Sequence, residues 1–226
     1  MNNLLIFDMD GVLVDVTESY RETIAATIEH FTGARPTNEQ IQQFKNRGGF
    51  NDDWELTHYI VTGVGFEVSF EETKAHFQKL FLGANRTDGL ILREKWFANP
   101  GTLEKLAADF RLAIFTGRPR DEAQITLSRF APALTFDPIV AMEDVARKKP
   151  DPEGLLRIAR AFPDSKLIYV GDSIDDARSA RAANIPFIGV AAPSNPSYLD
   201  LVFLFQSENA FAIIDDINYL HEVFAQ

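Results

Sequence analysis

Residues 4–11 read LLIFDMDG: four large apolar residues lead into Asp8, and a second acid, Asp10, stands just before Gly11. A short apolar run that ends in polar residues and glycine is typical of a strand buried on both faces, as in a parallel sheet. Similar runs predict further strands at residues 112–115, 139–142, 167–170, 186–190 and 201–205.

Helical patterns lie between most of these runs. They predict helices at residues 102–109, 120–130, 152–161 and 175–183, and a closing helix over about residues 210–224. Strands that alternate with helices are typical of βαβ units, whose crossovers are right-handed and whose sheets are mostly parallel. The sequence therefore predicts an α/β fold built on a mostly parallel sheet.

The interval after the first strand has a different character. Residues 17–31 place apolar side chains at helical spacing, and residues 37–46, 52–61 and 69–82 also have helical patterns. Nothing in this interval is typical of a buried strand. We therefore expect an all-helical domain at residues 16–90, inserted into a core formed by residues 1–15 and 91–226.

The composition is that of a folded, acidic protein. Of the 226 residues 46% are hydrophobic, and 22 Lys and Arg against 33 Asp and Glu give a net charge of −11. The apolar content supports a packed core and excludes disorder, while the negative charge argues against nucleic acid as a partner. The absence of cysteine excludes disulfides, zinc–thiolate sites and thiol nucleophiles.

Targeting signals are not evident in the sequence. No apolar stretch approaches the ~18 residues that a membrane helix needs. The first ten residues lack the basic region of a signal peptide and include an acid. We expect a cytoplasmic protein without a membrane partner, and either a monomer or a homodimer.

Polar clusters follow three of the predicted strands. Asp8 and Asp10 follow the first, Thr116 and Gly117 follow the strand at 112–115, and Asp172 follows the strand at 167–170. In open α/β sheets, ligands bind just beyond the carboxyl ends of the strands. Paired carboxylates there suit a hard cation, and one of them suits a nucleophile beside an acid/base. Each cluster taken alone also fits an ordinary turn or helix cap.

Two more segments complete this set. Lys149 stands before Pro150, where a proline can begin the next helix, although a solvated loop is the common place for a lysine. Residues 171–176, GDSIDD, place further acids at a helix start, where Asp and Ser also serve as ordinary caps.

Taken in chain order, these segments resemble the haloacid dehalogenase-like hydrolase superfamily. The matching residues are 8–12 (DMDGV), Thr116-Gly117, Lys149-Pro150 and 171–176. The resemblance covers the whole predicted core and implies a Rossmann-like arrangement. The helical insertion resembles the cap domain of the branch that contains phosphoglycolate phosphatase-like and β-phosphoglucomutase-like proteins.

The resemblance implies a role for each motif residue. Asp8 would be the nucleophile that forms an aspartyl-phosphate, and Asp10 the acid/base. Thr116, Gly117 and Lys149 would bind the phosphoryl oxygens.

The implied cofactor is Mg²⁺. Its ligands would be the carboxylates of Asp8 and Asp172 and the backbone carbonyl of Asp10, with Asp176 acting through water. The sequence leaves open whether Asp175 or Asp176 gives this support. A divalent cation is also what an acidic protein needs to hold a phosphate, and Mg²⁺ favours few carboxylates together with waters and phosphate oxygens.

The expected function is hydrolysis of a small phosphorylated metabolite by a Mg²⁺-dependent phosphoric monoester hydrolase. Dehalogenase chemistry goes, in this superfamily, with loss of the second aspartate, whereas Asp10 is present. A sugar phosphomutase of the β-phosphoglucomutase type is a second alternative. Those proteins carry a histidine where this chain has Tyr20, which weakens the mutase reading. An inactive metabolite-binding module is a third alternative, and the intact motifs argue against it.

One loop of the helical insertion is a candidate for substrate recognition. Residues 45–54 (KNRGGFNDDW) combine two cations, a glycine pair and polar groups, and Arg47 and Asn51 are its candidate specificity residues. A plain turn between two helices, with Trp54 in the core of the insertion, explains the same residues. Arg118 and Arg120 follow Thr116 closely, where a contact with substrate or with the cap is one alternative, but we expect them to be solvated residues at a helix start.

Overall fold

The chain divides into two compact units. The computed structural model describes residues 3–86, 88–195 and 197–224. One unit comprises Met1–Val14 and Trp96–Gln226, and the other comprises Asp15–Lys95. We call them the sheet unit and the helical unit, and we describe each by itself. Their assignment as a catalytic core and a cap domain stays a prediction.

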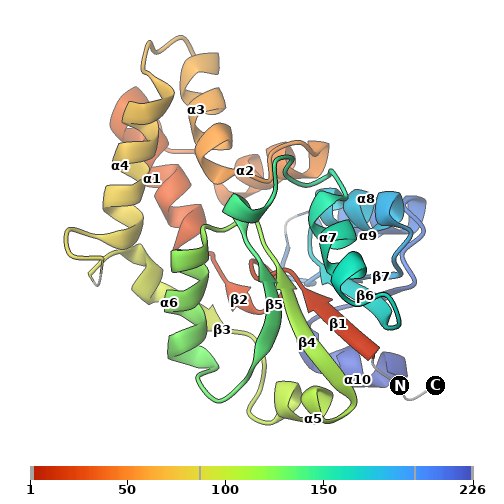
Figure 1. The fold of residues 1–226 in the computed structure, drawn as a ribbon. Helices are drawn as coiled ribbons and strands as arrows, with labels where there is room; N and C mark the ends of the chain where they lie inside the picture. Colours follow the sequence, from red (N-terminus) through yellow and green to blue (C-terminus); the bar gives the residue numbers. More distant parts are fainter. Residues whose placement is uncertain (1–2, 87, 196, 225–226) are drawn as a thin grey trace. The chain divides into compact units, whose positions relative to one another are not determined.

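A parallel sheet organises the sheet unit. Among the described residues, six strands form it in the order β5-β4-β1-β6-β7-β8, and each pair of neighbours runs parallel (Figure 1). The strands are β1 (Asn3–Phe7), β4 (Phe110–Phe115), β5 (Phe136–Val140), β6 (Lys166–Gly171), β7 (Phe187–Val190) and β8 (Ala212–Ile214). This arrangement confirms the predicted α/β class.

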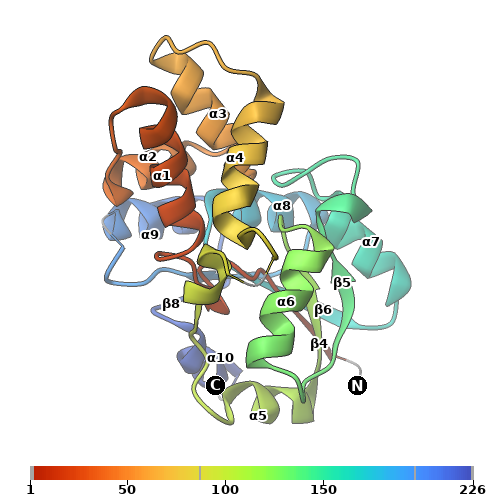
Figure 2. The same ribbon diagram turned by 90° about the vertical axis from the view of Figure 1, so that its left-hand side faces the viewer.

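Helices lie on both faces of this sheet. They are α5 (Thr102–Asp109), α6 (Arg120–Phe130), α7 (Glu153–Ala161), α8 (Ile174–Ala183), α9 (Tyr198–Ser207) and α10 (Leu220–Phe224), with short 3₁₀ turns η2 (Met142–Asp144) and η3 (Ile217–Tyr219). Figures 1 and 2 show α6 on the opposite side of β4 and β5 from α7 and α8. Successive strand residues point to opposite faces, so β1 buries Leu4 and Ile6 on the side of α7 and α8.

The end of the chain differs from the prediction. The predicted strand at 201–205 is wrong, because these residues lie inside α9, and the predicted closing helix at 210–224 begins instead with β8. A continuous apolar run has no period that distinguishes a strand from a helix. The structure shows the helical pattern: Leu201 and Phe205, four residues apart, are fully buried, whereas Phe203 between them is 69% exposed. A smaller shift affects 139–142, since β5 ends at Val140.

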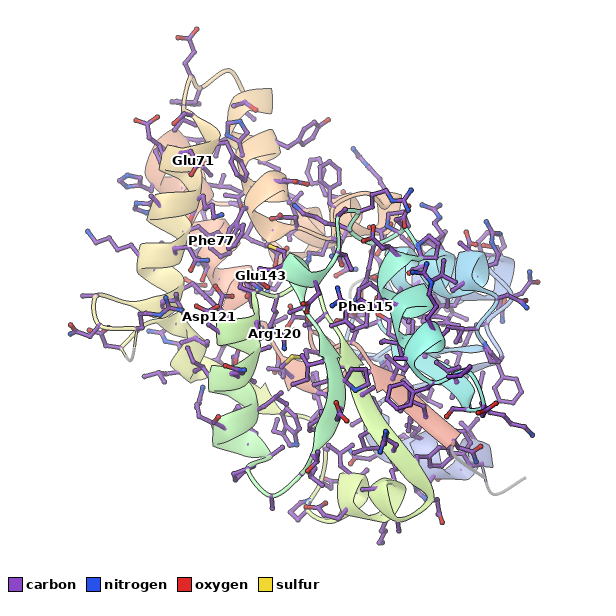
Figure 3. The ribbon with its side chains drawn as sticks, viewed as in Figure 1. Glu71, Phe77, Phe115, Arg120, Asp121 and Glu143 are labelled. Atoms are coloured by element: carbon purple, nitrogen blue, oxygen red, sulfur yellow. The ribbon has the colours of Figure 1, made fainter. Side chains whose placement is uncertain are left out.

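The helical unit contains four helices and a 3₁₀ turn among its described residues. They are α1 (Tyr20–Thr32), α2 (Asn38–Arg47), α3 (Asp53–Gly63), α4 (Phe70–Leu82) and η1 (Leu90–Arg93). Short strands β2 (Val14–Asp15) and β3 (Lys95–Trp96) pair where the chain passes between the units. Tyr20 packs on Phe77, which Figure 3 labels, and on Phe81, with ring centroids 6.1 and 4.0 Å away. Its ring therefore belongs to the core of this unit.

No helix in the described ranges is both long enough and apolar enough to span a membrane.

Candidate active site

The topology of the sheet brings three of the predicted site residues to one edge. In β1, Phe7 pairs with Ile114 of β4 and with Val170 of β6. The residues that follow these strands therefore lie at the same level, beyond the carboxyl ends of three adjacent parallel strands. Asp8 leaves β1 there, Thr116 leaves β4, and Asp172 leaves β6. This is the position in which open parallel sheets bind ligands.

Asp8 is an acid with little access to water. Only 6% of the residue is exposed, and its Oδ1 accepts a hydrogen bond from the backbone N–H of Met9 at 2.8 Å. Burial raises the pKa of Asp8 to about 7, although Lys149 opposes the shift, while the nearby carboxylates of Asp176 and Asp10 add to it. The environment thus penalises negative charge on Asp8 unless a further cation is close by.

Lys149 supplies one buried positive charge. It lies in the loop before α7, and its Nζ is 3.0 Å from Oδ1 of Asp8 and 2.8 Å from Oδ1 of Asp176. The ammonium group also lies over the ring of Phe115, labelled in Figure 3, at 4.8 Å from the centroid. Burial lowers the pKa of Lys149, but the two carboxylates outweigh it and raise the value. The lysine is therefore charged, and it links two acids.

Asp176 is held rigidly in the first turn of α8. Its Oδ1 accepts hydrogen bonds from Lys149 and from the Tyr169 hydroxyl at 2.6 Å, and its Oδ2 accepts one from the Ser173 hydroxyl at 2.6 Å. Burial raises its pKa, but Lys149 and these hydrogen bonds outweigh that effect and lower it. Gly171 permits the arrangement, because a Cβ at this position would lie 2.5 Å from the Cβ of Asp176. Asp176 is therefore ionised, and hydrogen bonds from neighbouring protein groups stabilise its negative charge.

Asp172 approaches the backbone of the loop after β1. Gly11 has φ +73°, and a Cβ on this residue would lie 1.8 Å from Oδ2 of Asp172. Only glycine fits both this conformation and this contact. Asp8, Asp172 and Asp176 each offer a carboxylate oxygen, and these three oxygens lie within 4.8 Å of one another. An all-oxygen donor set of this kind fits Mg²⁺ in its chemistry.

Thr116 and Gly117 form the turn after β4. Thr116 is buried; its N–H donates to the carbonyl of Val140, and its hydroxyl accepts a hydrogen bond from the N–H of Arg118 at 3.2 Å. The threonine side chain is thus fixed by its own turn. This geometry suits a hydroxyl that donates to an anion, since its one proton is not used in the bond to Arg118.

The expectation for Arg118 was wrong. Its side chain is 1% exposed, and its Nε and Nη2 lie 2.6 and 2.5 Å from Oδ1 of Asp10. Arg120 is only partly solvated, because it pairs with Asp144 and donates to the carbonyl of Ile139. Figure 3 shows Arg120 close to Glu143, which accepts a hydrogen bond from the Arg120 backbone N–H. The sequence places an arginine two residues after Thr116, but no local pattern marks Asp10 as its partner.

The loop between α2 and α3 lies in the helical unit. Arg47 is the last residue of α2 and places its guanidinium 4.9 Å from the ring centroid of Phe44. Asn51 precedes Asp52, whose side chain caps α3 by accepting hydrogen bonds from Trp54 and Glu55. The loop thus has the caps of an ordinary turn between helices. The role of Arg47 and Asn51 in specificity stays a prediction.

Comparisons with known proteins show what the chain as a whole is similar to. Residues 3–184 match the family model described as haloacid dehalogenase-like hydrolase. The chain is 27% identical over 184 residues to a phosphoglycolate phosphatase of Cereibacter sphaeroides, with 81% of this chain and 82% of that protein aligned. It is similar in structure to a haloacid dehalogenase-like hydrolase of Bacteroides fragilis, with a TM-score of 0.78, 25% identity, and 97% and 100% of the two chains covered.

A third similarity involves a longer protein. The chain is 34% identical over 197 residues to a protein of Phytophthora nicotianae named imidazoleglycerol-phosphate dehydratase. The alignment covers 84% of this chain but only 43% of that protein. The chain therefore spans less than half the length of this relative.

Proposed function

Because the chain belongs to the haloacid dehalogenase-like hydrolase family, we propose that it is a Mg²⁺-dependent phosphatase that hydrolyses a small phosphorylated metabolite through an aspartyl-phosphate on Asp8. The observation that carries the proposal is the buried ion triad of Asp8, Lys149 and Asp176 beside Asp172. It offers a nucleophile, a fixed cation and further oxygen ligands at one place. The phosphatase names of curated relatives also support it.

In the first proposed step, an oxygen of the Asp8 carboxylate attacks phosphorus and the bond to the ester oxygen breaks. The carboxyl group of Asp10 gives its proton to the departing oxygen, so the alcohol leaves neutral. Thr116, the backbone of Gly117 and Lys149 stabilise the negative charge on the transferring phosphoryl oxygens.

In the second proposed step, water attacks the phosphorus of the aspartyl-phosphate. The Asp10 carboxylate takes a proton from this water, and the bond between phosphorus and Asp8 breaks. Inorganic phosphate leaves, and both aspartates regain their initial states. One carboxyl group thus acts first as acid and then as base.

A metal would be held by the carboxylates of Asp8 and Asp172 and by the backbone carbonyl of Asp10. Bound there, Mg²⁺ supplies positive charge that neutralises the phosphate and favours the ionised form of Asp8. Asp176 is proposed to assist through water, because both of its oxygens already accept hydrogen bonds from protein groups. Of the two neighbouring acids, Asp176 has an oxygen within 4.8 Å of the oxygens of Asp8 and Asp172, which favours it over Asp175 as the supporting acid.

Two relatives suggest substrate classes. Phosphoglycolate is the substrate in the name of the Cereibacter protein. The dehydratase named in the Phytophthora protein implies a phosphate ester that carries an imidazole ring, and a dehydration leaves such an ester in place. A phosphatase region joined to it in one chain would then have a phosphate monoester to hydrolyse. We therefore place imidazole-bearing phosphate monoesters beside phosphoglycolate as candidate substrates.

The test is phosphate release from a panel that contains phosphoglycolate, imidazoleglycerol phosphate and other imidazole alcohol phosphates, sugar phosphates and an aryl phosphate. Each is measured with Mg²⁺ and with excess chelator. We expect turnover that needs Mg²⁺ and a preferred class within the panel. Absence of phosphate release from every compound would overturn the proposal and favour an inactive binding module. Interconversion of sugar phosphates without phosphate release would favour a mutase.

A further inference from the structure

Arg118 is a buried charge placed against the proposed acid/base. It is one of the largest fully buried side chains in the part of the chain described by the structure. A buried guanidinium is costly unless it is paired and hydrogen-bonded. Asp10 pairs with it, and both Nε and Nη2 of Arg118 contact the same oxygen, Oδ1, at 2.6 and 2.5 Å. The ion pair joins the loop after β1 to the loop after β4.

The guanidinium is itself anchored from the opposite side. Its Nη1 donates to Oγ1 of Thr126, a fully buried residue of α6, at 2.9 Å. Its backbone is fixed as well, because the N–H donates to the Thr116 hydroxyl and the carbonyl accepts from Met142. A planar fork held at several points has one orientation, so it fixes the position of the acid that it contacts.

Asp10 is much more open than its partner. Its side chain is 30% exposed, while that of Arg118 is 1% exposed. An aspartate at a partly solvated site samples several rotamers unless another group restrains it. A general acid must lie within hydrogen-bond reach of the oxygen that it protonates, so time spent in other rotamers lowers the rate.

We propose that Arg118 is a positioning residue that holds Asp10 in the orientation needed for proton transfer to the leaving oxygen. This inference rests on the proposed phosphatase function. Arg118 acts through Asp10, and its hydrogen bond to the buried Thr126 ties the guanidinium that contacts Asp10 to helix α6. The contribution of Arg118 should therefore follow the demand for proton transfer, and should not depend on phosphate binding.

The leaving group provides a readout that a merely structural role would not change. The alkoxide of an alkyl phosphate is a poor leaving group unless it is protonated, whereas p-nitrophenyl phosphate releases p-nitrophenolate readily without a proton. We expect Arg118→Met to lower the phosphorylation rate with an alkyl phosphate by at least ~10-fold more than with p-nitrophenyl phosphate, since acid–base catalysis contributes ~10²–10⁴-fold. Arg118→Lys, which keeps the charge but lacks the fork, should show a smaller loss of the same kind.

A double-variant comparison ties this effect to Asp10. Asp10→Asn alone should show the same preference for the aryl substrate, and adding Arg118→Met to it should cause little further loss. The matched control is Arg120→Met, which removes the nearby arginine at the start of α6 that pairs with Asp144 instead. It should change the phosphorylation rates with both substrates by the same factor.

Two results would overturn the inference: equal losses of Arg118→Met on both substrates, or losses that multiply in the double variant. If Arg118→Met does not fold, Thr126→Val removes the hydroxyl that accepts from Arg118, together with its own bond to the carbonyl of Glu122 within α6. This variant should show the same leaving-group preference at smaller size, and equal losses on both substrates overturn the inference as well. The wild-type enzyme tests the proposed function separately. If wild type releases no phosphate, the function fails; if it does and the variants show no preference, only the role of Arg118 fails.

Discussion

The Nζ of Lys149 lies 3.0 Å from Oδ1 of Asp8, and both side chains are almost completely removed from water. The same ammonium group contacts Asp176 at 2.8 Å, so one buried cation serves two acids. Within this triad, negative charge exceeds positive charge when both acids are ionised. The triad therefore carries an excess of negative charge, and a bound Mg²⁺ would offset it.

Removal of the shared cation should destabilise the protein. Lys149→Met leaves Asp8 and Asp176 buried without their partner, and breaking a buried pair in this way costs ~3–5 kcal/mol. We expect this loss in denaturant unfolding with chelator present. Adding Asp176→Asn should recover part of it, because one of the stranded charges is then gone. Wild-type stability in Lys149→Met would contradict the assignment of the triad.

The nucleophile and the metal ligand can be tested by amide substitutions. Asp8→Asn and Asp172→Asn should each remove nearly all phosphatase activity, because one variant lacks the carboxylate proposed to attack phosphorus and the other the carboxylate proposed to bind Mg²⁺. Both should keep the circular dichroism spectrum of the wild type, since an amide nearly matches a carboxylate in shape. Wild-type turnover that does not change in excess chelator would rule out the metal assignment.

The pKa of Asp8 predicts how stability depends on pH in the metal-free protein. It is about 7 in the folded chain, mainly because of burial, against an ordinary 3.8. Between these pKa values the folded state holds a proton on Asp8 that the unfolded state has lost. The contribution of Asp8 to the free energy of unfolding therefore falls as pH rises from ~4 to ~7. The Asp8→Asn variant has no ionisable group at this position, so it does not lose stability in this way as pH rises.

Thermal unfolding of wild type and Asp8→Asn in chelator measures this effect. The variant should gain a few degrees in Tm relative to wild type between pH 5 and pH 8. The gain should level off above pH 8. A difference in Tm that stays constant over this range would show that the pKa of Asp8 is not raised in the folded chain.

Asp10→Asn should separate the two chemical steps. With an aryl phosphate the first step needs little proton assistance, whereas attack by water needs a base whatever the substrate was. Rapid mixing should therefore give a burst of aryl alcohol near one equivalent per enzyme, followed by a slow phase. Wild type should accumulate no long-lived phosphoenzyme. A stable phosphoenzyme in wild type that passes its phosphate to an added sugar phosphate would favour the mutase.

Substitution of Arg47 tests whether the helical unit contributes to substrate recognition. Arg47→Ala should weaken turnover of the preferred substrate of the panel, but affect a small aryl phosphate much less, because that compound offers little for the loop to hold. The control is Arg35→Ala, an exposed arginine of the same unit that pairs with Glu22 and Glu29. Equal losses of turnover on both substrates, or no loss on either, would show that the loop is only a turn between helices and does not contact the substrate.

Sequence pattern alone was sufficient for most of the sheet unit. The apolar runs of β1, β4 and β6 are bounded by polar residues, and amphipathic stretches separate them, so their alternation predicts parallel strands and crossover helices. The order of motifs at the strand ends also led to the family. Pattern failed at Leu201 and Phe205, where every residue is apolar and periodicity has nothing to distinguish.

The site shows the same division. Asp8, Asp172 and Lys149 could be predicted from the sequence, because strand ends and helix starts are local features that a short motif marks. The pair of Asp10 and Arg118 could not, since the two residues are 108 positions apart and meet only because β1 and β4 are neighbours in the sheet. The sequence determined which side chains stand directly after the strands. The packing of α6 over the sheet decided that Arg118 is excluded from water, because burial is a property of the surrounding elements and not of the residue itself.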